Sequence, residues 1–468
     1  VLLIAIDDLN DWVGVLGGHP DTRTPVLDSL AASGMLFTNA HTQAPLCAPS
    51  RVALLTSMLP STTGIYFQIR DTLVKESSPA TRRAVNLPEY LAAQGFKTMG
   101  AGKIWHGNDL AGTFQEYGER GEWFGPRPPQ RQAYVPEEGP NYDGVNSTNT
   151  DWGAWPLRDE DMSDYQYADW AIDKLGRTHD DPFFLAVGFV RPHVPWYVPP
   201  RWLETFDPEQ ITLPPYNPDD MDDVPQIAQE LMLSAPMPTT EYLKAKGQWA
   251  DAVRAYLASV HWVDHQVGRV LQALRESPHA DNTLVVLFSD HGYHMGEKNR
   301  FSKMSLWERD TRVPVMISGP GIPAGRSSSR PVGLVDLYPT MLDLLGVPAN
   351  ELNEGRSLSP LIADPQREWP WPALTMFGPN MVSVRGDRFR YIRYEDGSEE
   401  LYDHANDPNE WTNLARDPAA MAEHRDDVER LRAAIPDSMA PLAEHSFYLG
   451  NAFSRANMPR WRGESTQP

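Results

Sequence analysis

The chain has 468 residues, of which 41% are hydrophobic and 22% are charged, as in a globular enzyme built from one large domain or from two to three units. Its formal net charge of −22 argues against a nucleic-acid partner and against adsorption to an anionic membrane. No apolar run approaches the roughly 20 residues that span a bilayer, so we expect no membrane insertion.

The first half of the chain alternates strand and helix patterns. The opening run VLLIAIDD predicts a buried parallel strand that ends in two carboxylates, Asp7 and Asp8. Helices are expected at about 24–33, with Gly34 as the stop, and at about 88–95, ending at Gly95. A strand at 96–99 then leads into a Gly-Ala-Gly-Lys turn.

The same alternation continues toward residue 290. Residues 181–190 predict another buried strand, and apolar residues at helical spacing predict a long helix over 256–274. The strand at 283–290 again ends in a carboxylate, Asp290. This order predicts an α/β fold, a mostly parallel sheet between helices, with functional groups at the carboxyl ends of the strands.

Two parts of the chain depart from this pattern. The irregular segments at 107–160 and 199–240 are either substrate-facing loops or surface decoration. Residues 381–403 predict short antiparallel strands, and a helix is expected over 419–434. We therefore expect a catalytic α/β domain over 1–365 and a smaller C-terminal α+β subdomain over 366–468.

Cys47 is the single cysteine, so no intrachain disulfide can form. A lone cysteine is more often a small buried hydrophobe than a reactive group. Here it begins the sequence CAPSRVALLTS, and the pattern Cys-x-Pro-Ser-Arg favours a reactive site that includes Arg51.

This pattern resembles the signature of the sulfatase family, in which the cysteine is oxidised to formylglycine by a separate maturation enzyme. The resemblance implies an alkaline-phosphatase-like fold and a geminal diol at residue 47, one hydroxyl of which attacks sulfur while the other allows sulfate to be eliminated. The family usually has Gly where this chain has Ser57. The stretches RPHVPW and SDHG are most similar to the group around iduronate-2-sulfatase.

The resemblance also implies a metal site. Asp7, Asp8, Asp290 and His291, with an oxygen of residue 47, would bind one divalent cation, and oxygen-rich ligands suit Ca²⁺. His291 is less typical of calcium, because imidazole prefers softer metals. Many sulfatases carry Asn at this position.

The remaining catalytic roles follow the family's motifs. Arg51 and Lys103 would orient the diol, and Asp290 would take a proton from the attacking hydroxyl. His193 and Lys303 would contact the leaving-group oxygen, and His106 would remove the last proton. Taken singly, each histidine is more often structural.

The substrate is less well defined by the sequence. Trp196, His294 and Arg300 follow the catalytic motifs and are candidates for lining the pocket, although they could equally only pack or decorate its rim. We expect a sulfated saccharide, such as a uronate or algal sugar, and therefore a periplasmic or secreted enzyme. The alternatives are a phosphonate or phosphate ester hydrolase of the same superfamily and a catalytically silent carbohydrate-binding relative.

Overall fold

A nine-stranded sheet forms the centre of the computed structural model, which describes residues 1–107, 112–119, 121–122, 124–134, 148–232, 237–447 and 452–463. The strand order is β10-β2-β9-β8-β1-β6-β3-β4, and β11 pairs with β2. The strands are β1 (Leu2–Ile6), β2 (Met35–His41), β3 (Lys97–Gly102), β4 (Glu116–Tyr117), β6 (Phe183–Phe189), β8 (Val285–Ser289), β9 (Arg312–Ser318), β10 (Arg326–Ser328) and β11 (Val332–Gly333).

The sheet is parallel except around β9, which runs antiparallel to both β2 and β8. Strand β1 lies between β8 and β6, with Leu2 opposite Val285 on one side and Leu185 on the other. It is buried on both faces, because alternate side chains enter two separate hydrophobic cores. The expected mostly parallel α/β sheet is therefore confirmed.

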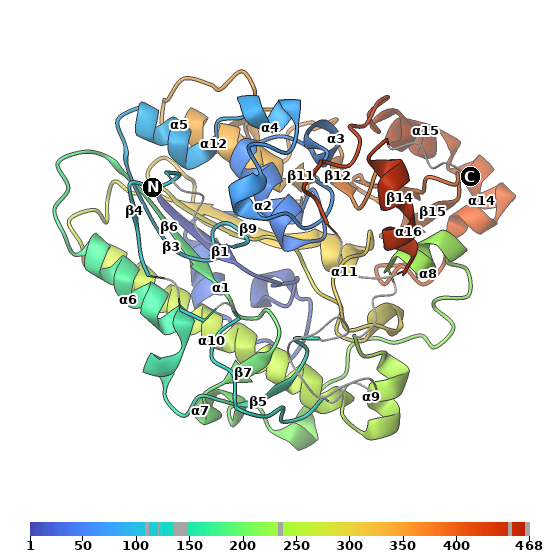
Figure 1. Ribbon diagram of the computed structural model, residues 1–468, viewed down its shortest axis with the longest axis horizontal. Helices are drawn as coiled ribbons and strands as arrows, with labels where there is room; N and C mark the ends of the chain where they lie inside the picture. Colours follow the sequence, from blue (N-terminus) through green and yellow to red (C-terminus); the bar gives the residue numbers. More distant parts are fainter. Residues whose placement is uncertain are drawn as a thin grey trace.

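Helices cover both faces of this sheet (Figure 1). One core holds α1 (Pro25–Ala32), α6 (Ser163–Leu175) and the 27-residue α10 (Trp249–Arg275). The other holds α2 (Cys47–Thr56), α5 (Leu87–Ala93) and α12 (Leu337–Leu344). Shorter helices in the connections are α3 (Pro60–Thr63), α4 (Pro79–Arg83), α7 (Pro200–Leu203), α8 (Gln226–Met232), α9 (Thr240–Lys246), α11 (Glu308–Thr311) and α13 (Ser359–Ala363).

A second, four-stranded antiparallel sheet is formed near the C-terminus (Figure 1). Its strands are β12 (Ala373–Met376), β13 (Val382–Arg385), β14 (Phe389–Arg393) and β15 (Glu399–Asp403). Strands β5 (Trp152–Ala154) and β7 (Trp196–Val198) make a separate parallel pair, and α16 (Ala452–Trp461) is the last helix. The single helix expected over 419–434 is wrong, because the backbone at His424 (φ −102°, ψ 22°) divides it into α14 (Pro418–Glu423) and α15 (Arg425–Ala433).

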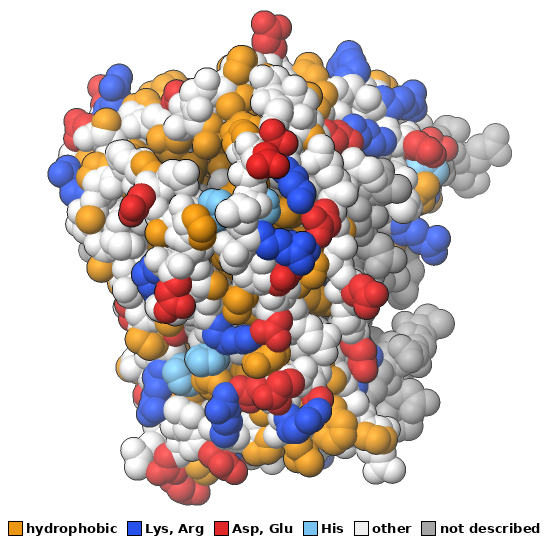
Figure 2. All heavy atoms as spheres, turned by 90° about the vertical axis from the view of Figure 1, so that its left-hand side faces the viewer, with side chains coloured by type: hydrophobic (Ala, Val, Ile, Leu, Met, Phe, Trp, Pro, Cys, Tyr) orange, Lys and Arg blue, Asp and Glu red, His pale blue; other side chains and the backbone are white. Residues whose placement is uncertain are grey.

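The surface carries charges of both signs. On the side seen in Figure 2, acidic and basic side chains are interspersed. Within the described parts of the chain, no helix is both long enough and apolar enough to cross a membrane.

Candidate active site

The candidate site lies where four neighbouring parallel strands end. Asp7 and Asp8 follow β1, Asp290 follows β8, Lys103 follows β3 and His193 comes shortly after β6. Since the carboxyl ends of parallel strands meet at one edge of a sheet, these polar side chains converge although up to 283 positions separate them in the sequence.

Asp8 turns the chain away from the sheet with a left-handed backbone (φ 62°). A non-glycine residue in this region is strained and needs support from its surroundings. Tyr256 of α10 gives that support, because its hydroxyl donates to the Asp8 carbonyl (2.8 Å) and accepts from the Asn10 amide (3.1 Å). The long helix thus fixes the turn that aims the Asp8 carboxylate.

Cys47 is the first residue of α2 and is 1% exposed. Its Sγ lies 3.0 Å from Lys303 Nζ, 3.2 Å from His291 Nε2 and 3.7 Å from Lys103 Nζ. The thiol is therefore surrounded by polar groups, unlike a cysteine that only fills an apolar core.

Arg51, one helical turn further along α2, connects Asp7 with Asp290. Its guanidinium donates to Asp290 Oδ2 (2.9 Å) and to Asp7 Oδ1 (3.2 Å), and it also contacts the carbonyls of Lys103 and Ile104. The planar guanidinium group offers several N–H donors and suits this arrangement. The arginine is fully buried among its acceptors.

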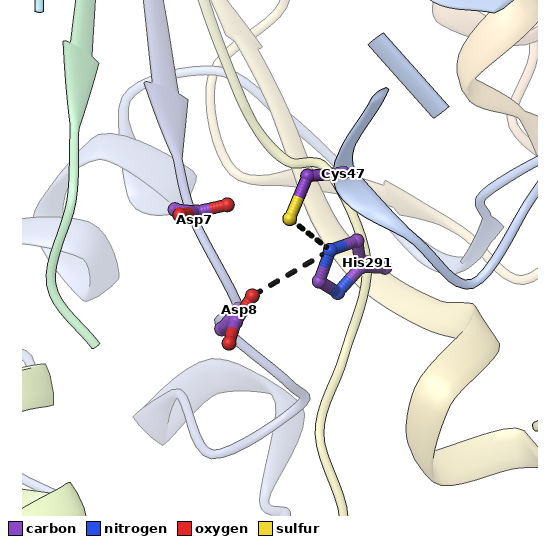
Figure 3. A group of neighbouring side chains, drawn as sticks. All are labelled: Asp7, Asp8, Cys47 and His291. Carbon is purple, nitrogen blue, oxygen red and sulfur yellow. Dashed lines mark hydrogen bonds and ion pairs between the residues drawn. The ribbon is translucent and has the colours of Figure 1, made fainter. Parts of the chain in front are cut away.

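Asp7, Asp8, Cys47 and His291 form a cluster whose candidate ligand atoms all lie within 4.8 Å of one another (Figure 3). The His291 Nδ1 donates to the Gly292 carbonyl (3.0 Å), which leaves Nε2 unprotonated and facing the cluster. Asp8 Oδ2 is buried and, among the described residues, has no hydrogen-bond partner. An unpaired buried carboxylate oxygen beside an imidazole lone pair is a fit for a divalent cation.

The charges of the site shift the pKa values of its acids in opposite directions. Burial raises the pKa of Asp7, but the positive charges of Lys103 and Arg51 outweigh it and hold that pKa well below its usual range. Burial raises the pKa of Asp8 to about 7 against the opposing charge of Lys303. Asp8 is therefore the carboxylate whose ionised form an added cation would stabilise most.

The thiol of Cys47 is not activated as a nucleophile. Burial, followed by the negative charge of Asp7, raises its pKa, whereas a reactive cysteine needs a lowered pKa to supply thiolate. The unmodified side chain therefore does not explain the polar site built around it.

His193 faces the acidic cluster from the β6 side. Its Nδ1 donates to the Val194 carbonyl (2.5 Å), and its Nε2 lies 3.9 Å from Asp8 Oδ2. Burial, with Lys303 next, lowers its pKa well below the usual value, so the ring is neutral before an anionic group arrives. Phe124 stacks on this ring at 4.9 Å, so the irregular segment at 107–160 reaches the site.

His106 approaches the first turn of α2 through Gln68. The Gln68 Oε1 accepts from the Ala48 amide (3.2 Å), and its Nε2 lies 3.3 Å from His106 Nε2. Burial lowers the pKa of His106 well below its usual value. The ring is therefore neutral in the free site.

The structure corrects the prediction that Trp196 lines the pocket. This side chain is fully buried in the core, and its indole donates to the Pro192 carbonyl (2.8 Å). It packs edge-on against Tyr256 and Tyr293, so it has no free face for a sugar ring.

His294 and Arg300 are also buried, but they lie beside the loop that carries Lys303. Arg300 donates to the Lys303 carbonyl (2.6 Å), and His294 Nδ1 is 2.7 Å from Asp310 Oδ1. Both hold this loop in place. A direct contact with substrate stays a prediction for these two residues.

Ser57 replaces the family's usual glycine at the end of α2, and its backbone is left-handed (φ 51°). Its hydroxyl donates to the Val335 carbonyl (2.8 Å) and accepts from the Gly355 amide (3.1 Å). Two hydrogen bonds therefore offset a conformation that glycine would adopt without strain.

Three residues at the site were not found by sequence reasoning: Gln68, Phe124 and the supporting Tyr256. Gln68 and Phe124 lie in irregular segments that carry no motif. The helical pattern placed Tyr256 on a core-facing stripe, but its hydroxyl was a signal that it bonds something inside.

Comparison with known proteins agrees with this geometry. The family model described as Sulfatase matches residues 1–347, and the one described as N-sulphoglucosamine sulphohydrolase, C-terminal, matches residues 296–435. The chain therefore belongs to the sulfatase family and is a sulfuric ester hydrolase.

Individual relatives extend over most of the chain. A sulfatase of Formosa agariphila is 41% identical, over 96% of this chain and 88% of the relative. The iduronate 2-sulfatase of Mus musculus is 32% identical, over 74% of this chain and 69% of its own length. The phosphonate monoester hydrolase of Agrobacterium radiobacter shares the fold, with a TM-score of 0.75 and 24% identity over 92% of this chain and 94% of that structure.

Proposed function

We propose that this sulfatase hydrolyses a sulfate ester on a saccharide, using a formylglycine made from Cys47 and one bound Ca²⁺. The observation that carries the proposal is the position of the Cys47 Sγ, within 3.7 Å of the Lys103 and Lys303 ammonium groups and of the His291 Nε2, and inside a cluster of cation-ligand atoms. In this arrangement an oxygen in place of sulfur would lie among the residues that would hold the metal and beside the two lysine ammonium groups.

A chain of net charge −22 repels an anionic substrate at long range, so binding depends on the local charges of the site. Three cationic side chains, Arg51, Lys103 and Lys303, are paired with three carboxylates, Asp7, Asp8 and Asp290, so their formal charges cancel. A divalent cation then makes the buried site positive, and in a low-dielectric interior this local field outweighs distant surface charges.

Asp7, Asp8, Asp290, His291 and residue 47 would hold the calcium, which supplies positive charge to the sulfonyl oxygens, while the formylglycine diol supplies the nucleophile. Arg51 keeps Asp7 and Asp290 apart and oriented. Both oxygens of Asp290 accept hydrogen bonds, Oδ1 from the Asp8 and His291 amides and Oδ2 from Arg51. With both oxygens fixed in this way, Asp290 would take the proton of the attacking hydroxyl.

Lys303 and His193 are placed to receive the leaving-group oxygen. Lys303 lies between the thiol and Asp8, and its ammonium is held there by a 2.6 Å ion pair. His193 is neutral in the free site, and an incoming sulfate ester would favour its protonated form, which can then donate to the leaving oxygen. His106, which Gln68 links to the start of α2, would accept the proton released when sulfate departs.

A saccharide substrate is supported by the similarity to iduronate 2-sulfatase, whose name specifies a sulfated uronic sugar. Since sulfated polymers lie outside cells, we propose a periplasmic or secreted enzyme that meets its maturation enzyme before or during export. We also propose that residues 1–365 form the catalytic domain and that 366–468 form the C-terminal subdomain.

The test begins with the enzyme co-expressed with a formylglycine-generating enzyme. Peptide mass spectrometry should show the aldehyde at residue 47, and sulfate release should be measured on sulfated saccharides, nitrophenyl sulfate, a phosphate diester and a phosphonate ester. We expect the highest kcat/KM on a sulfated saccharide. Preference for a phosphorus ester, or unmodified Cys47 in a fully active preparation, would overturn the proposal.

Two control experiments test the formylglycine nucleophile and the bound metal separately. Cys47→Ser keeps one hydroxyl but cannot form the diol, so we expect it to retain sulfate covalently after a single turnover. Chelation followed by stepwise addition of Ca²⁺, Mg²⁺ or Mn²⁺ should restore activity best with Ca²⁺, and a chelated enzyme with full activity would exclude the metal from the proposal.

A further inference from the structure

Gln68 links the start of the nucleophile's helix to His106. It lies between α3 and the first turn of α4, twenty residues after Ala48, and its side chain makes both contacts at once. The first amides of a helix have no partner within the helix, so Gln68 Oε1 supplies the missing acceptor to Ala48.

The Ala48 contact fixes which way the Gln68 amide points. A backbone N–H can only donate, so the oxygen of Gln68 must face Ala48 and the NH₂ group must face His106. Because the NH₂ group also only donates, the His106 Nε2 must carry its lone pair. The neutral ring then has its proton on Nδ1.

The backbone of Gln68 is held as well. Its carbonyl accepts from the Phe447 amide (2.7 Å) and from the Ser446 hydroxyl (3.3 Å), in an isolated antiparallel bridge. A segment 378 or more positions further along the chain therefore fixes Gln68 from the opposite side. With main chain and side chain both held, the residue can impose a fixed orientation on the imidazole.

We propose that Gln68 is a positioning residue that holds His106 in the tautomer with an unprotonated Nε2. At 3.3 Å the contact is long, so it leaves the Nε2 lone pair able to accept from a second donor. This inference rests on the proposed function in one respect, the role of His106 as the base that frees sulfate.

Two substitutions separate the two contacts. Gln68→Glu keeps an oxygen for Ala48 but turns an acceptor toward His106, which requires a proton on Nε2. Gln68→Met removes both contacts at nearly the same volume. Gln43→Glu is the matched control, because Gln43 is a buried amide that accepts from the Val335 amide (2.7 Å) and has no contact with His106 among those described for it.

The experiment uses the matured, calcium-loaded enzyme with ¹⁵N-labelled histidine. Two-bond ¹H–¹⁵N correlation spectra report which ring nitrogen is protonated, and the His106 signals are identified by their loss in His106→Gln. Steady-state kinetics on the best sulfated substrate give kcat and KM separately, and thermal unfolding checks that each variant is folded.

We expect an unprotonated Nε2 in the parent enzyme and in Gln43→Glu, and a protonated Nε2 in Gln68→Glu. We expect kcat to fall by about 10-fold to 100-fold in Gln68→Glu with KM little changed, and by less in Gln68→Met. A parent enzyme with its proton on Nε2, or a Gln68→Glu variant with unaltered kcat and tautomer, would overturn the inference. If His106→Gln itself keeps full kcat, the base assignment in the proposed function fails, while the spectra still decide what Gln68 does.

Discussion

Arg51 Nε donates to Asp290 Oδ2 over 2.9 Å, and this bond connects two residues that are 239 positions apart. It ties the first turns of α2 to the end of β8, so the helix that begins at Cys47 and the strand that precedes Asp290 keep one geometry. The pair is fully desolvated, and a buried charge that loses its partner is costly.

Arg51→Lys keeps the charge but removes the fork. One ammonium cannot reach Asp7, Asp290 and two carbonyls together, so we expect kcat/KM to fall at least about 100-fold and the free energy of unfolding to fall by about 1–3 kcal/mol. Steady-state kinetics and urea unfolding measure both.

The control for that variant is Arg390→Lys. Arg390 is equally buried and pairs with Glu410 at 2.6 Å, within a network that includes Glu308 and none of the site residues. We expect a similar loss of stability with kcat unchanged. Equal loss of activity in both variants would show that Arg51 acts through stability alone.

His291→Asn tests the metal-ligand set. It replaces an imidazole nitrogen with an amide oxygen, which a hard cation prefers, so we expect Ca²⁺ to bind at least as tightly and kcat/KM to stay within about tenfold. His291→Ala removes the ligand and should weaken Ca²⁺ binding by at least about tenfold. Calorimetric titration of the chelated enzyme distinguishes the variants, and equal Kd values in all three would exclude His291 as a ligand.

Ser57 provides a test of local strain. Ser57→Ala keeps the left-handed backbone and loses both hydrogen bonds, so we expect the free energy of unfolding to fall by about 1–3 kcal/mol. Ser57→Gly loses the same bonds but relieves the strain, and should be about 1 kcal/mol more stable than Ser57→Ala. Urea unfolding of the two variants gives the comparison, and a less stable glycine variant would contradict the account.

The raised pKa of Asp264 predicts that the stability of the protein depends on pH. It accepts from the Leu27 amide (2.9 Å) and the Val26 amide (3.2 Å) at the start of α1, and burial raises its pKa to about 7. Between the unfolded pKa near 4 and this value, the folded protein binds the extra proton. This residue's contribution to stability is therefore fully present below pH 4 and is lost as the pH rises toward 7.

Asp264→Asn cannot titrate, so its free energy of unfolding should lack that decline. We expect the stability of the parent relative to Asp264→Asn to decrease between about pH 4 and about pH 7, by up to roughly 1.4 kcal/mol per unit of displaced pKa. Urea unfolding at several pH values checks this, and a constant difference between the two proteins would show that Asp264 is ionised throughout.

Much of the fold followed from local patterns in the chain. The run VLLIAIDD became β1, buried on both faces, and the stripe through Tyr256 became α10, because alternating and helical periodicities record which faces are buried. The break at His424 was not predicted, since a single backbone change inside a helical pattern leaves little trace in composition.

Some residues of the candidate site were likewise predicted from the sequence, and others were not. The sequence predicted one site from Cys47, Arg51 and the carboxylates that end β1 and β8, because the chemistry proposed for them demands particular residue types, and the structure brings these residues together. Trp196 was misplaced, since the same indole can stack on a sugar or fill a core, and only its packed neighbours decide which.

The sequence by itself determined the order of strands and helices, the sulfatase signature and the charged groups proposed for the reaction, because these depend on residue identity and short-range spacing. The tertiary structure alone decided that Gln68 meets both Ala48 and His106, that Tyr256 supports the strained Asp8, and that Asp8 Oδ2 is left without a hydrogen bond from the described residues. Such contacts join positions far apart in the chain, and their partners are chosen by packing in three dimensions, which no local pattern records.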